Sequence, residues 1–176
     1  GFQIVKVIFE CLPKICVTAL LYVADAGQTH PGILVPCGHS PAGQAYSQGL
    51  AQRLVKSGYI VLSWDSAGQG ERSQFWDAKQ KKSRYNLICA EHAVMGNLAY
   101  LAGTNLSRWE VWDGIRAGDY RLTRPDVDSQ RISLIGSSGG GFHTALLGPL
   151  DERIKVIIPS CYITALAMRV KNGVLL

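Results

Sequence analysis

Short apolar runs, separated by polar stretches that carry glycine, recur along the chain and predict strands alternating with helices. The first two runs, residues 3–10 and 15–23, are rich in β-branched residues and are joined by a turn at Leu12 to Lys14. Tyr59 to Trp64 is almost continuously apolar, which is typical of a strand buried on both faces of a sheet. Three further apolar runs also predict strands: residues 33–36, 131–135 and 154–159.

Between these runs, apolar residues recur at helical spacing in four segments: residues 44–57, 86–102, 107–122 and 139–147. Gly58 follows the first segment, at a position where helices commonly end. The stretches 25–31, 66–84 and 126–130 carry turn-forming residues and predict loops. Because strands and helices alternate from residue 33 onward, we expect a three-layer α/β sandwich, a mostly parallel sheet with helices on both faces.

The length fits one domain over residues 1–176, since the pattern shows neither an internal repeat nor a linker. Hydrophobic residues make up 47% and charged residues 18% of the chain, so it can bury a core, and disorder is excluded.

The net charge of +5 would suit an anionic partner, but the basic residues are scattered. The one dense run, Lys79 to Arg84, is interpreted as a solvated loop, because no nucleic-acid-binding module accompanies it. The apolar start of the chain is interrupted by Glu10, Pro13 and Lys14, so we expect neither a signal peptide nor a membrane partner.

The five cysteines form no CxxC pair and no cluster with histidine at zinc-binding spacing, so no metal site is expected. Their odd number argues against a disulfide framework, and we expect most of them to be small buried apolar residues. This usage favours a reducing compartment and hence a cytoplasmic location.

Residues Gly136 to Gly140 match the pattern G-x-S-x-G, with Ser138 at its centre. A predicted strand runs directly into the motif and a predicted helix runs directly out of it, which is the setting of a nucleophile elbow. A side chain at Gly136 or Gly140 would collide with neighbouring backbone. The N–H of Gly139 would face developing negative charge near the start of the helix. The alternative is a phosphate-binding turn over Gly136–Gly141, although no P-loop lysine follows the glycines.

Two loops at strand ends supply further candidate residues for the site. Gly38 follows the strand at 33–36 and allows backbone to approach a substrate, and the N–H of His39 or Ser40 could complete an oxyanion hole. The side chain of His39 is expected only to hydrogen-bond locally. Asp65 follows the strand that ends at Trp64, where it could order its loop by accepting backbone N–H bonds or contact a substrate.

These motifs resemble the α/β-hydrolase superfamily, and most closely its acetyl-xylan-esterase-like and dienelactone-hydrolase-like members. The resemblance covers VPCGHS, YIVLSWDSAGQGERS and the elbow GSSGGG. It implies that Ser138 attacks an ester carbonyl while the N–H groups of Gly139 and His39 hold the oxyanion. It also implies a small ester as substrate, an acylated carbohydrate being one option, and no cofactor.

The chain departs from the superfamily order of serine, acid and then histidine. After Ser138 the acids are Asp151 and Glu152, in a turn before the next strand, and the only histidine is His143. His143 lies on the elbow's own helix and His92 on another predicted helix, and both are expected to be structural. His39 as base would break the family order, but it remains an alternative.

The pattern therefore predicts a partial α/β-hydrolase domain that is truncated after the sixth strand and lacks the last strands. The strand at 154–159 would then be an unpaired apolar edge, which favours a homo-oligomer. Three functions follow as alternatives: a serine esterase, a catalytically incomplete binding or assembly module, and a nucleotide or phosphate binder.

Overall fold

The structure is a computed structural model that describes residues 1–24, 27–85 and 88–172. In this part of the chain, six strands form one mixed sheet in the order β1-β2-β4-β3-β7-β8. Its strands β3, β4, β7 and β8 run parallel, whereas β2 pairs antiparallel with both β1 and β4. The strand bounds are β1 Phe2–Leu12, β2 Ile15–Ala24, β3 His30–Pro36, β4 Ile60–Trp64, β7 Val127–Ser137 and β8 Ile154–Ser160.

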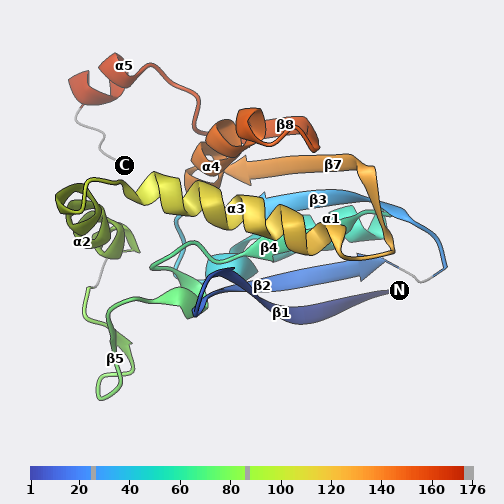
Figure 1. Cartoon of the computed structure of the whole chain (residues 1–176), viewed down its shortest axis with the longest axis horizontal. Coiled ribbons are helices and arrows are strands. Elements are labelled where there is room, and N and C mark those ends of the chain that lie inside the picture. The colour runs from blue at the N-terminus through green and yellow to red at the C-terminus, as the bar shows by residue number, and fades with distance from the viewer. Residues whose placement is uncertain (25–26, 86–87, 173–176) are drawn as a thin grey trace.

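Side chains alternate between the two faces of the sheet and build a core on each. Leu34 of β3 belongs to the core under α3 (Leu106–Leu122) and α4 (Gly139–Leu147). Its neighbours Ile33 and Val35 belong to the opposite core, under α1 (Gln48–Lys56). The expected three-layer α/β architecture is thus confirmed (Figure 1).

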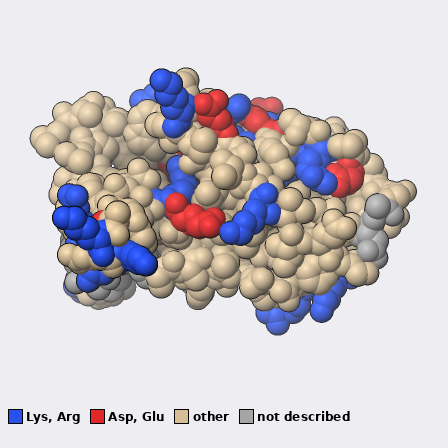
Figure 2. All heavy atoms as spheres, turned by 90° about the horizontal axis from the view of Figure 1, so that it is seen from below, with Lys and Arg blue, Asp and Glu red and all other residues tan. Residues whose placement is uncertain are grey.

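The shorter elements surround the sheet. Figure 1 shows α2 and β5 at the end toward which the arrowhead of β7 points. In Figure 2, basic side chains are spread over one face and form a group at the same end. The bounds are η1 Gly43–Ser47, η2 Gly70–Arg72, β5 Trp76–Asp77, β6 Lys82–Ser83, α2 Ile88–Leu101, η3 Gly148–Leu150 and α5 Leu166–Lys171.

Most of the expected elements form, and Gly58 ends α1 as predicted, with a φ of 88°. The prediction of a loop at 126–130 is wrong. Val127 and Asp128 pair with His30 and Pro31, so β7 begins within these residues. The 66–84 excursion contains the small β5–β6 hairpin. Residues 25–26 of the expected link and 86–87 of the expected helix lie outside the described residues.

The cysteines differ in burial more than expected. Cys11 and Cys37 are buried and Cys89 is half-buried, but Cys16 and Cys161 are exposed, and all five thiols are free. Among the described residues, no helix is both long and apolar enough to cross a bilayer.

Candidate functional site

Ser138 occupies the junction between β7 and α4, where its backbone adopts φ 58° and ψ −120°. A positive φ is unfavourable for a residue with a side chain, so the surrounding structure must hold this turn in place. Two backbone hydrogen bonds do so. The Ser138 N–H donates to the carbonyl of Ser160 at 2.9 Å, and the Phe142 N–H donates to the carbonyl of Ser138 at 2.9 Å. Ser138 itself is exposed.

The glycines on either side are required for close packing, as expected from the motif. A Cβ on Gly136 would lie 2.6 Å from Thr144 Oγ1 and closer still to the carbonyl group of Gly140. A Cβ on Gly140 would collide with the carbonyl oxygen of Pro36. The sharp turn therefore depends on both positions lacking a side chain.

The loop after β3 lies directly against this turn. A Cβ on Gly38 would be 2.6 Å from the Ser137 carbonyl oxygen and 3.7 Å from Ser138 Cβ. The Ser40 N–H is already engaged, because it donates to Gln69 Oε1 at 2.8 Å. Among the described residues, the His39 N–H has no acceptor, and the Gly139 N–H lies in the first turn of α4, where intrahelical acceptors are lacking. Of the expected oxyanion donors, His39 and Gly139 therefore remain available.

Asp65 is fully buried and orders two loops. Its carboxylate accepts hydrogen bonds from the Thr18 hydroxyl at 2.6 Å, from the Gln44 N–H at 2.6 Å and from the Glu71 N–H at 3.1 Å. Burial raises the pKa of Asp65, and these hydrogen bonds oppose that rise. With its oxygens engaged in this way, the Asp65 carboxylate ties the loop after β4 to β2 and to η1.

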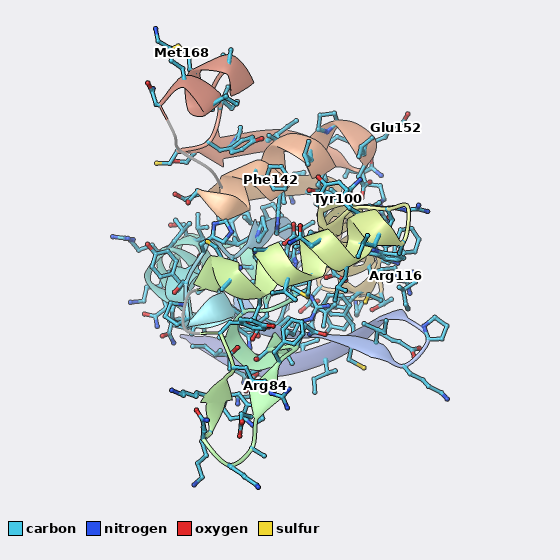
Figure 3. All side chains as sticks on the ribbon, turned by 90° about the vertical axis from the view of Figure 1, so that its left-hand side faces the viewer. Arg84, Tyr100, Arg116, Phe142, Glu152 and Met168 are labelled. Atoms are coloured by element: carbon cyan, nitrogen blue, oxygen red, sulfur yellow. The ribbon has the colours of Figure 1, made fainter. Side chains whose placement is uncertain are left out.

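Beside the elbow lies a cavity of about 200 Å³ that four elements line. His39 follows β3, His92 belongs to α2, Glu110 to α3, and His143 to α4. Figure 3 looks onto this end of the molecule, with Phe142 on one side of α2 and Arg84 on the other. The two histidines expected to be only structural thus join His39 around Glu110. The sequence carried one signal for this cluster, an acid at Glu110 among the apolar positions of its helix.

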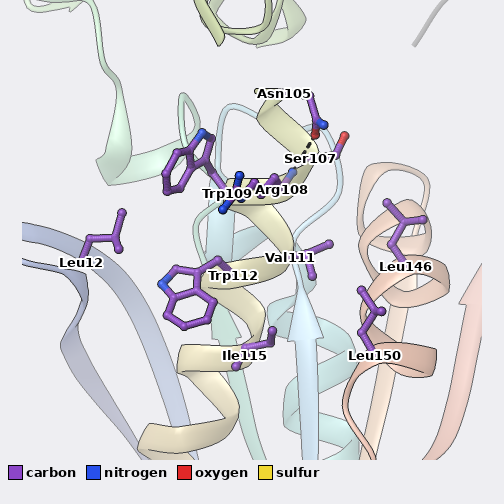
Figure 4. A pocket seen from close by; sticks show the side chains of 10 residues that line it. All are labelled: Leu12, Asn105, Ser107, Arg108, Trp109, Val111, Trp112, Ile115, Leu146 and Leu150. Carbon is purple, nitrogen blue, oxygen red and sulfur yellow. Dashed lines mark hydrogen bonds between the residues drawn. The ribbon is translucent and has the colours of Figure 1, made fainter. Parts of the chain in front are cut away.

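A second cavity, of about 760 Å³, lies over the outer side of α3 (Figure 4). Trp109 and Trp112 line it together with Leu12 of β1 and Leu146 of α4. It shares Ser107 with the smaller cavity, and Ser138 is in the lining of neither; the smaller cavity reaches the elbow at Gly139.

The two acids that follow the elbow in the chain lie at the other end of the sheet from Ser138. Asp151 and Glu152 precede β8, whereas Ser138 stands at the carboxyl end of the neighbouring parallel strand β7. Asp151 is buried and forms an ion pair with Arg153 at 2.6 Å. Among the described residues, no group of three or more His, Cys, Asp or Glu side chains is arranged to hold a metal ion.

Known structures share this arrangement of sheet and helices. A protein of Bacteroides fragilis NCTC 9343, assigned as an acetyl xylan esterase, superposes with a TM-score of 0.74 at 22% identity, over 88% of this chain and 43% of its own. An acetyl xylan esterase from Paenibacillus sp. R4 gives a TM-score of 0.59 at 21% identity, over 99% of this chain and 58% of its own. The chain has the α/β-hydrolase fold. The fold that the sequence resemblance implied is therefore confirmed.

Among curated proteins, YtaP of Bacillus subtilis (strain 168), assigned as a hydrolase, is 30% identical over 112 residues. That match covers 64% of this chain and 32% of YtaP. No family profile matches the sequence. The chain therefore spans less than half the length of YtaP and of the Bacteroides protein.

Proposed function

We infer that this chain carries the nucleophile of a serine carboxylic-ester hydrolase, with Ser138 as the attacking group. The single observation that supports this most is the backbone of Ser138, an exposed residue held at φ 58° on a strand-to-helix turn. Proteins retain unfavourable backbone at functional sites, and this turn is the one that exposes a serine hydroxyl at the edge of a hydrolase sheet.

The surrounding groups support ester chemistry. The N–H groups of Gly139 and His39 would stabilise the negative charge that forms on the carbonyl oxygen when Ser138 attacks. The acyl-enzyme would release an alcohol, and water would then release the acid. Since proteins of this fold include acetyl xylan esterases, we propose small esters as substrates, acylated carbohydrates among them.

Labelling with a fluorophosphonate tests the nucleophile. We expect the wild-type chain to be acylated and Ser138→Ala to lose labelling completely, because the alanine has no hydroxyl. Mass spectrometry of the labelled peptide measures both. Ser137→Ala is the matched control, since Ser137 is the adjacent exposed serine, and it should label like the wild type. No labelling of the folded wild type would contradict the proposal.

A second candidate is a catalytically incomplete assembly module that self-associates through β8. The edge strand β8 exposes Val156, Ile157 and Ile158 at 48%, 41% and 46%. Neighbouring apolar side chains on an edge strand favour pairing with another strand, here that of a second copy.

A lysine on this strand tests the candidate. Ile158→Lys is expected to convert an oligomer into a monomer, because the charge would have to be buried in the interface. Sedimentation velocity measures the change. Leu98→Lys, at an exposed position of α2, is the control and should leave the oligomeric state unchanged. A wild-type chain that is monomeric at high concentration would exclude this candidate.

A further inference from the structure

A basic hairpin, β5–β6, lies at the end of the molecule where the parallel strands end (Figure 1). Residues 76–85 carry four basic side chains and one acidic side chain, Asp77. Asp77 is half-buried and accepts from the N–H groups of Lys79 and Gln80 at 2.9 Å and 3.1 Å, so it shapes the turn. The hairpin therefore presents an excess of positive charge to solvent through four exposed side chains: Lys79, Lys81, Lys82 and Arg84.

Aromatic side chains accompany this charge. Trp76 is 55% exposed, and Tyr85 is 36% exposed. Tyr85 meets Phe75 edge to face, with the ring centroids 5.0 Å apart, at the base of the hairpin. The indole of Trp76 offers a flat apolar face on which the ring of a ligand can stack.

One buried carboxylate anchors the hairpin to α2. Glu91 is 2% exposed and accepts from the Ser73 hydroxyl at 2.6 Å and from the Gln74 N–H at 2.7 Å. It also accepts from the hydroxyl of Ser83 in β6. These bonds define the position of the hairpin, so binding of a ligand there costs little additional ordering.

A third cavity, of about 260 Å³, lies between the hairpin and the loops after β3 and β4. Trp76, Lys81 and Lys82 line it from the hairpin. Pro41 and Gln69 line it from the two loops. The cavity is smaller than typical ligand pockets, which have roughly 300–1,000 Å³, so it suits one part of a ligand rather than a whole one.

This third cavity lies close to the elbow. A Cβ on Gly38 would be 3.7 Å from Ser138 Cβ, and Pro41, three residues further along the same loop, lines the cavity. Three residues span at most about 11 Å between Cα atoms. On α2, Glu91 lines the third cavity, whereas the next residue, His92, lines the cavity beside the elbow. A ligand of a few rings can therefore occupy the third cavity and still reach Ser138.

We propose that the third cavity and its hairpin bind a sugar residue that carries a carboxylate, so that the substrate is an ester of an acidic carbohydrate. This inference rests on the ester hydrolysis proposed for Ser138. The indole of Trp76 stacks on one face of the sugar ring, and the ammonium groups of Lys81 and Lys82 pair with the carboxylate. A carbohydrate fits better than a nucleic acid, which binds through a longer row of phosphate contacts and offers no carboxylic ester.

Isothermal titration calorimetry with two unesterified oligosaccharides tests this site without catalysis. One probe is xylotriose that carries a single glucuronate residue, and the other is unsubstituted xylotriose. At low salt the wild type should bind the acidic probe about 10-fold more tightly, because two exposed ion pairs contribute modestly to affinity. Raising the salt concentration from about 0.01 M to 0.15 M should reduce this preference, since the charges are then screened.

Variants of the hairpin separate charge from stacking. Lys81→Gln/Lys82→Gln should lose the preference and bind the two probes about equally. Trp76→Ala should bind the acidic probe about 10-fold more weakly than the wild type, because the stacking face is lost. Lys155→Gln is the matched control, since Lys155 is an exposed lysine at the start of β8, at the opposite end of the sheet, and it should bind like the wild type. Circular dichroism verifies that each variant is folded.

Three results would overturn the site. These are failure of the wild type to prefer the acidic probe, an unchanged preference in Lys81→Gln/Lys82→Gln, and tighter binding of a short single-stranded oligothymidylate, which would indicate a nucleic-acid surface. None of these titrations requires a reactive Ser138. Absence of fluorophosphonate labelling would contradict the function proposed for Ser138 without changing the titrations, so the two failures are distinguishable.

Discussion

Gly136→Ala is expected to destabilise the fold by about 3 kcal/mol and to abolish labelling of Ser138. The added methyl group would meet the carbonyl group of Gly140 and the Thr144 hydroxyl, which belong to the first two turns of α4. Backbone cannot give way as a flexible side chain does, so α4 or the end of β7 must move. Because small domains are stable by only about 5–15 kcal/mol, this loss is a large part of the total.

Urea unfolding followed by circular dichroism measures the change, and fluorophosphonate labelling of the folded fraction measures the site. Gly49→Ala is the matched control. Gly49 lies in α1, where a Cβ would have no neighbour within 4 Å, so alanine should stabilise the helix by about 0.5–1 kcal/mol. If Gly136→Ala were as stable as the wild type and labelled normally, the close packing of the elbow would be disproved.

The elbow could be predicted because its determinants are local. The apolar run before Gly136 and the helical pattern after Ser138 are adjacent in the chain, and α4 spans the predicted residues 139–147. The beginning of β7 was missed because Asp128 to Gln130 are polar. Their strand conformation comes from pairing with β3, a partner almost a hundred residues away that a local pattern does not reveal.

The histidine cluster could not be predicted for the same reason. Each of its members comes from a different element, and the spacing of His39, His92 and His143 along the chain carries no motif. Each residue alone fits a role in packing. Only the stacking of α2, α3 and α4 beside the loop after β3 brings them to one cavity.

Arg72→Met is expected to cost about 3–5 kcal/mol, because it leaves a buried carboxylate without its cation. Arg72 Nη1 donates to Asp113 Oδ2 at 2.6 Å, and both side chains are buried, with exposed fractions of 7% and 5%. The same nitrogen donates to the Asp65 carbonyl oxygen at 2.9 Å. Methionine fills similar space but supplies neither hydrogen bond, so Asp113 would have to be protonated or hydrated in the folded state.

The double variant Arg72→Met/Asp113→Leu separates the unpaired charge from the lost packing. Removing both partners should recover stability relative to Arg72→Met alone, since replacement of a whole buried pair by apolar residues is often neutral. Urea midpoints of the wild type, the two single variants and the double variant measure this coupling. If the Arg72→Met and double variants were equally stable, the unpaired Asp113 carboxylate would not be the cause of the lost stability.

The same substitution has an expected consequence at the site. The Arg72 side chain closes the loop that starts at Asp65, since its Nη1 donates to the Asp65 carbonyl oxygen, and the substitution removes this bond. This loop presents Ala67, whose carbonyl oxygen lies 2.7 Å from His92 Nε2, and Gln69, which accepts from the Ser40 N–H beside His39. Loosening it should therefore slow labelling of the folded Arg72→Met chain at neutral pH. A wild-type labelling rate in that variant would mean that the loop holds its position without the ion pair.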